Sequence, residues 1–83
     1  MKNKSYALYN LKEMQQDLIR IIKDIETNSE YANEEFAVDV TQLYHHLNTA
    51  WNAKDASAER TEKCSESDYE LWRQFPSKED LHL

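Results

Sequence analysis

Glycine is absent from all 83 residues of this chain, and proline occurs once, at Pro76. Average usage would supply roughly six glycines in a chain of this length. Glycine provides the positive φ angles of two-residue hairpin turns and of phosphate-cradling loops. Its absence excludes Gly-rich nucleotide-binding loops and argues against a β-hairpin fold. The composition instead favours helices joined by short turns of Asn, Ser and Asp.

Cysteine is also scarce, because Cys64 is the only one. One thiol cannot form an internal disulfide, so the sequence predicts a reducing compartment. The basic start of the chain is followed by no apolar run of the kind that a secretory signal needs. The densest apolar stretch, residues 18–25, is interrupted by three charged side chains, so no membrane span is expected. These features together predict a cytoplasmic location.

The charge is negative and unevenly distributed, with a net value of −6. Residues 28–83 carry twelve acidic and five basic side chains, whereas residues 1–27 are nearly balanced. Nucleic-acid-binding proteins displace counterions from phosphates with clustered basic residues. The acidic excess therefore predicts no nucleic-acid partner. It suits either solubility alone or an acidic surface offered to a basic partner.

Residues from about 5 to 26 show the 3.6-residue periodicity of an amphipathic helix, with Ser5 as its expected N-cap. Gln15 lies inside the apolar arc, where a polar group fixes register at some cost in stability. The arc spans roughly 160°, which exceeds the seam of a two-stranded coiled coil. This helix is therefore expected to contact at least two neighbours. Its apolar members are Leu8, Leu11, Met14, Leu18, Ile19, Ile21, Ile22 and Ile25.

A second helix is predicted over residues 34–54, with Asn33 as its N-cap. Asn28 is expected to end the first helix in the left-handed conformation, since glycine is absent. Two long helices with a short connector predict an antiparallel helical hairpin. The apolar stripe of the second helix consists of Phe36, Val40, Leu43, Tyr44, Leu47, Ala50 and Trp51.

A shorter third helix is predicted near residues 67–75, capped by Ser65 or Ser67 and ended by Pro76. Residues 58–66 offer little to a core, and the sequence leaves open whether they form helical turns or a loop. The expected fold is therefore a small all-α bundle in a single domain, residues 1–76. Residues 77–83 are expected to form a flexible C-terminal tail.

Few residues suggest a catalytic or metal-binding site. His45 and His46 are adjacent, and neighbouring helical side chains point about 100° apart, so the two cannot readily bind one metal. The pattern predicts neither a cofactor nor a metal, and it favours a protein that is not an enzyme. The alternative is a small metal-dependent hydrolase or a metal-binding helical bundle. Its candidate metal or acid–base groups are Asp39, His46, Glu59 and Glu62.

Aromatic side chains are numerous for so small a chain. They are either core residues or a surface for another protein, where Trp and Tyr dominate binding energy. Wide apolar arcs on two helices also favour a homodimer, in which two hairpins form a four-helix arrangement. The sequence thus predicts a non-enzymatic protein that acts by protein–protein interaction. The candidate partner surface is Tyr44, Trp51, Tyr69, Trp72 and Phe75.

Overall fold

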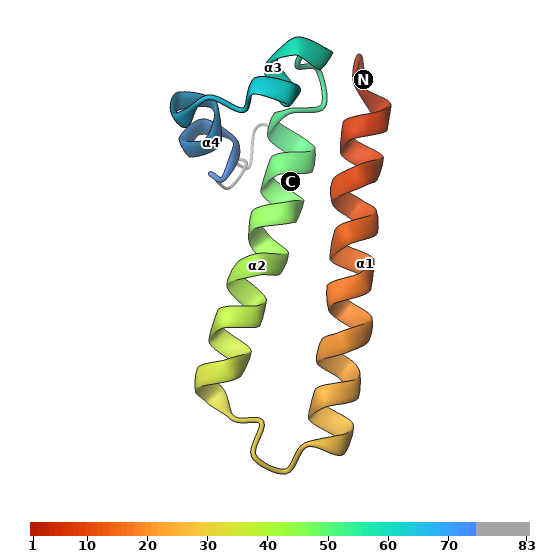
Figure 1. Cartoon of the computed structure of the whole chain (residues 1–83), viewed down its shortest axis with the longest axis vertical. Helices are drawn as coiled ribbons and strands as arrows, with labels where there is room; N and C mark the ends of the chain where they lie inside the picture. Colours follow the sequence, from red (N-terminus) through yellow and green to blue (C-terminus); the bar gives the residue numbers. More distant parts are fainter. Residues whose placement is uncertain (75–83) are drawn as a thin grey trace, which may run out of the picture.

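The computed structural model describes residues 1–74. Its four helices are α1 (Lys4–Thr27), α2 (Asn33–Asn52), α3 (Ala58–Lys63) and α4 (Glu66–Trp72). The two long helices run antiparallel and form a hairpin, while α3 and α4 gather at its open end (Figure 1). The predicted all-α bundle with a long hairpin is confirmed. The predictions for Phe75, Pro76 and the tail at residues 77–83 lie outside the described residues.

Helix α1 is capped by Asn3, not by Ser5 as predicted. The Asn3 side-chain oxygen accepts a hydrogen bond from the Tyr6 amide at 3.1 Å. Asn3 also donates to two carbonyls just beyond the end of α2, through its backbone amide to Lys54 at 2.8 Å and through Nδ2 to Ala56 at 3.0 Å. One asparagine therefore both begins α1 and fastens it to the chain beyond α2.

The turn between α1 and α2 also differs from the prediction. Asn28 is extended, with φ −113° and ψ 103°, and its side chain accepts from the Glu30 amide at 3.0 Å. This Asx-type bond turns the chain without a left-handed residue. Ala32, not Asn33, precedes the first turn of α2, and the Glu35 carboxylate accepts from the Ala32 amide at 3.1 Å. Glu35 therefore accepts from the amide of Ala32, whose own side chain cannot accept a capping hydrogen bond.

Two serines begin the short helices. Ser57 accepts from the Arg60 amide to cap α3, and Ser65 accepts from the Asp68 amide to cap α4, both at 3.2 Å. Residues 58–63 are thus helical, which decides the choice that the sequence left open. Between the two helices, Cys64 adopts a left-handed conformation with φ 41°. A glycine would hold this angle without strain.

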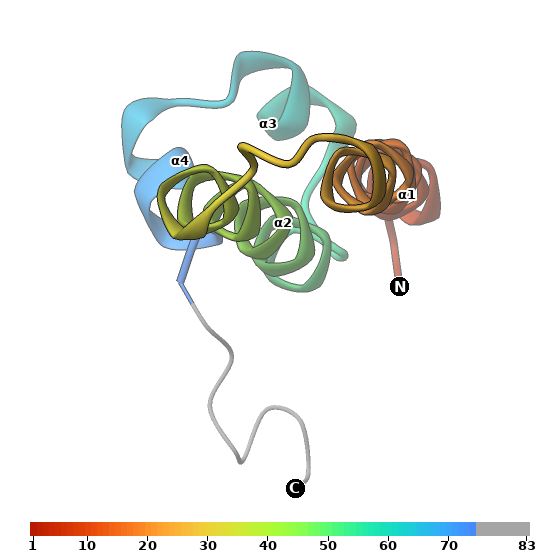
Figure 2. The same cartoon turned by 90° about the horizontal axis from the view of Figure 1, so that it is seen from below.

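The core lies at the open end of the hairpin, where Trp72 of α4 packs with Ala53, Ala56 and Tyr6. Trp72 is only 2% exposed, so it is a core residue and not part of a partner surface as predicted. Seen along the hairpin, α3 lies to one side of α1 and α2, and α4 lies against α2 (Figure 2). The other buried apolar residues described are Ala7, Ile21 and Ala50.

Helix α4 is held on α2 by amide side chains as well as by Trp72. Asn48 donates to the Arg73 carbonyl at 2.9 Å, and Asn52 donates to the carbonyls of Trp72 and Gln74 at 2.9 and 2.6 Å. These carbonyls lie at the C-terminal end of α4 and just beyond it, where carbonyl groups lack intrahelical partners. The side of α2 that carries Asn48 and Asn52 is therefore occupied by α4.

Candidate protein-interaction face

The seam between α1 and α2 has two edges of different chemistry. Along one edge, polar and charged side chains of the two helices bond to each other. Along the other edge, both helices present apolar side chains that remain partly exposed. The sequence produces this division because the two residue classes repeat with helical spacing on different arcs of each helix.

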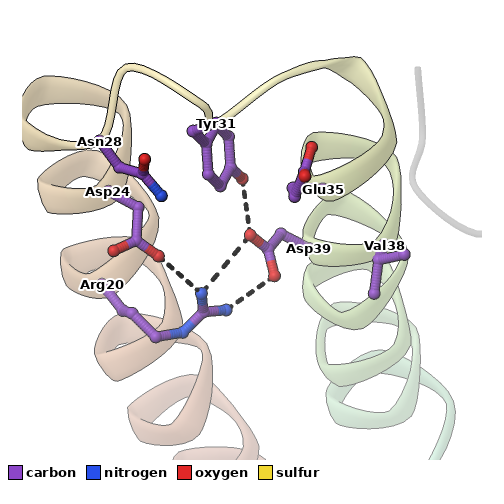
Figure 3. A pocket seen from close by; sticks show the side chains of 7 residues that line it. All are labelled: Arg20, Asp24, Asn28, Tyr31, Glu35, Val38 and Asp39. Atoms are coloured by element: carbon purple, nitrogen blue, oxygen red, sulfur yellow. Dashed lines mark hydrogen bonds and ion pairs between the residues drawn. The ribbon is translucent and has the colours of Figure 1, made fainter.

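Arg20 and Asp39 form the centre of the polar edge (Figure 3). Arg20 Nη2 donates to Asp39 Oδ1 at 2.8 Å, and Nη1 donates to Asp24 Oδ2 at 3.2 Å. The Tyr31 hydroxyl donates to Asp39 Oδ2 at 2.6 Å. These groups, with Val38 and Glu35, line an open pocket of about 330 Å³ near the turn of the hairpin.

The environment of this network shifts the pKa values of Asp39 and Tyr31. Hydrogen bonds from Arg20 and Tyr31 lower the pKa of the Asp39 carboxyl. Desolvation, followed by the bond to Asp39, raises the pKa of the Tyr31 hydroxyl to about 12. Arg20 pairs with both Asp24 and Asp39, so the triad keeps a net charge of −1, but each of its charged groups already has a partner within the protein. The network instead connects α1, the turn and α2.

A second polar contact crosses the seam nearer the core. Asn10 is 4% exposed and donates to the Tyr6 carbonyl at 3.0 Å. Its side-chain oxygen lies 3.3 Å from His46 Nδ1, and His46 Nε2 lies 3.6 Å from an Asp17 carboxylate oxygen. His46 therefore bridges α2 to two residues of α1 and fixes the register of the helices.

The residues of the alternative metal or acid–base site do not come together. Asp39 and His46 lie two turns apart on α2 and bond to different α1 partners. Glu59 lies on α3 and pairs with Lys63 at 2.9 Å, and Glu62 is exposed on the same short helix. Within residues 1–74, no three His, Cys, Asp or Glu side chains form a group that could hold a metal ion.

His45 faces α4 instead of solvent. Its ring centroid lies 5.1 Å from that of Tyr69. Burial is the main cause that lowers the pKa of His45, with smaller contributions from His46 and Arg73. His45 is therefore part of the α2–α4 contact.

The opposite edge of the seam forms what we call the apolar face. Nine of its large side chains expose between 40% and 63% of their surface, although they repeat with core-like spacing. Small open pockets follow it, one between Met14 and Leu43 and another between Ala7 and Trp51. The face consists of Leu8, Leu11, Leu18, Ile19, Ile22, Ile25, Phe36, Val40, Tyr44, Leu47 and Trp51.

The predicted aromatic surface is divided by the structure. Tyr44 is 45% exposed on the apolar face. Trp51, half-buried on the same face, has the Lys54 ammonium 4.1 Å from its ring. Tyr69 is 40% exposed but belongs to α4, and its ring contacts His45 and Arg73. The aromatic residues of the candidate surface thus do not form one patch; aliphatic side chains of α1 and α2 do.

Comparison with known proteins gives no relative from which a role could be transferred: no family model, curated protein or solved structure matches this chain. Within the described residues, no helix has both the length and the apolarity that crossing a membrane requires. The structure therefore defines an all-α protein with a long helical hairpin and an apolar face.

Proposed function

We propose that this chain is a non-enzymatic protein that mediates protein–protein interaction through the apolar face of α1 and α2. Nine large apolar side chains on these two helices remain 40–63% exposed. Contiguous exposed apolar patches larger than a few hundred Å² are rare on monomeric proteins and mark sites of interaction with other molecules. The size of this half-exposed face is the observation that carries the proposal.

The packing of the hairpin supports this role. Most of the buried apolar residues described are alanines, so α1 and α2 bury few large side chains against each other. Cores of chains this short are marginal, and association is a common way to complete them. A partner seated on the apolar face would bury the side chains that the hairpin leaves half-exposed.

The polar edge supports a role without catalysis. Catalysis requires titratable groups that converge in a pocket and remain available to a substrate. In the pocket beside Tyr31, Arg20 is bonded to Asp24 and Asp39, and the second carboxylate oxygen of Asp39 is occupied by Tyr31. These bonds are better suited to holding the hairpin together. We place the protein in the cytoplasm, with no nucleic-acid partner.

Site-specific photo-crosslinking in cells of the native host tests the proposed function. A photoreactive residue in place of Ile22 stands on the apolar face, whereas one in place of Gln16 stands on the same helix away from it. We expect a protein adduct from position 22 and little or none from position 16. Equal labelling from both positions, or no adduct from position 22, would contradict the proposed function.

A further inference from the structure

The outward part of the apolar face on α1 is symmetric about Gln15. Seven exposed positions, from Lys4 to Glu26, are separated by 4, 3, 4, 4, 3 and 4 residues. At 3.6 residues per turn they fall within one arc of about 80°, which we call the α1 stripe. Its members equidistant from Gln15 are Lys4 and Glu26, Leu8 and Ile22, and Leu11 and Ile19.

A second copy docked antiparallel would place a complementary residue opposite each residue of the α1 stripe. With Gln15 opposite Gln15, the Lys4 ammonium faces the Glu26 carboxylate of the other copy, and each apolar side chain faces an apolar one. Every pair occurs twice because the arrangement is two-fold symmetric. The two Gln15 amides meet at the axis, where each can donate to the other's carbonyl. One polar layer in an apolar seam specifies register and orientation.

The apolar residues of α2 are also arranged in pairs equidistant from one midpoint, and this midpoint lies beside Gln15 of α1. Its paired positions share a midpoint between Leu43 and Tyr44: Phe36 with Trp51, and Val40 with Leu47. Met14, which precedes Gln15, lines one pocket with Leu43 and Tyr44, so the two midpoints lie level. A single two-fold axis therefore serves both helices.

The terminal charges of α1 give an independent reason for an antiparallel partner. Lys4 is the first residue of α1 and Glu26 lies in its last turn, while the first turn has no acid and the last turn no base. Both charges oppose the dipole of their own helix. In the antiparallel pair, Lys4 approaches the negative end of the other α1 and Glu26 its positive end. The charges thus favour the pair over the isolated helix.

We propose that the apolar face is covered by a second copy of this chain, docked antiparallel about a two-fold axis beside Gln15; this inference rests on the proposed function. The result is a four-helix bundle with the two hairpin turns at opposite ends. Helix α4 packs on the side of α2 that carries His45 and Asn48, away from the apolar face, so each copy retains its own core.

Charge reversal tests the register by sedimentation velocity at low salt. Lys4 and Glu26 lie about 33 Å apart along one helix, so they cannot interact within a chain. K4E and E26K each place like charges at both ends of the α1 stripe, and we expect each to weaken the homodimer about tenfold. The equimolar mixture should recover wild-type affinity as a heterodimer, because opposite charges then meet at both ends. Unchanged affinities, or no preference for the heterodimer, would overturn the proposed register.

The central layer has a matched control. Gln15→Glu places two carboxylates together at the axis and should dissociate the dimer at neutral pH, whereas Gln16→Glu adds the same charge outside the α1 stripe and should not. Circular dichroism confirms that each variant folds; K4E and E26K improve the match to the helix dipole and should keep full helicity. Equal effects of Gln15→Glu and Gln16→Glu would contradict an axis at Gln15.

The two proposals fail in different ways. Wild-type chain that sediments as a 9.9 kDa particle at every concentration up to the millimolar range overturns the dimer. If position 22 then still crosslinks to a different protein, the interaction role stands and only the second copy is wrong. If no adduct forms either, both proposals are wrong.

Discussion

Replacement of Trp72 by alanine should release α4 while leaving the hairpin folded. Trp72 is 2% exposed, and its ring centroid lies 6.1 Å from that of Tyr6. The Arg60 guanidinium lies 5.6 Å from the centroid of the Trp72 ring. Truncating a buried tryptophan costs about 3–5 kcal/mol. Helix α4 has seven residues, and isolated helices shorter than about 12–15 residues are marginal in water. Without Trp72, the bonds from Asn48 and Asn52 have no ordered α4 to hold.

Amide hydrogen exchange measures this release residue by residue. A loss of about 3–5 kcal/mol corresponds to exchange roughly 10²–10³·⁵ times faster at the α4 amides, since 1.4 kcal/mol is tenfold. Amides in the middle of α1 and in the part of α2 before His45 should keep their protection, because the α2 contacts with α4 come from His45, Asn48 and Asn52. Leu71→Ala is the control, because Leu71 adjoins Trp72 in α4 but is 54% exposed. Its truncation should change the free energy of unfolding by about 0.5 kcal/mol or less. Unchanged protection of α4, or equal loss across α1, would refute the reasoning.

Three further predictions concern single residues. Cys64→Gly should stabilise the chain by about 0.5–1 kcal/mol in urea unfolding, because φ 41° strains a residue with a side chain. The folded-state pKa of Asp39 is lowered, so its contribution to stability is present above its unfolded-state pKa and is lost as pH falls through the folded-state value. Asp39→Asn should therefore flatten the acid side of the melting-temperature profile. A spectrophotometric titration should show one tyrosine ionising near pH 12, and Tyr31→Phe should remove it.

Much of the fold follows from composition and periodicity. The absence of glycine and the two apolar arcs predict a helical hairpin, and the hairpin is observed. The caps were harder to predict, because Asn3 and Ser5 are both good N-cap residues and local sequence does not separate them. Asn3 caps α1 because it also reaches Lys54 and Ala56, which are distant in sequence. Tertiary contacts of this kind are invisible to a local pattern.

The sequence alone indicated part of the exposed apolar face. The width of the α1 arc indicated more than one neighbour, and the structure leaves that arc half-exposed. Aromatic identity alone does not predict where a ring lies in the fold, and Trp72 is buried in the core. The bonds from Arg20 and Tyr31 to Asp39 join residues that are 19 and 8 positions apart, so no local pattern predicts them. Charges spaced i, i+4 within one helix carry no signal for such cross-helix pairs.

Oxidative crosslinking at Gln15 tests the account most directly. A disulfide requires Cα atoms about 4.4–6.8 Å apart, a separation that only residues beside the two-fold axis can reach with their own copy. In a Cys64→Ser background, Gln15→Cys should give a disulfide-linked dimer under mild oxidation, and Gln16→Cys should remain monomeric. A Gln15→Cys chain that stays monomeric, or that crosslinks no faster than Gln16→Cys, would contradict the proposal that a second copy covers the apolar face.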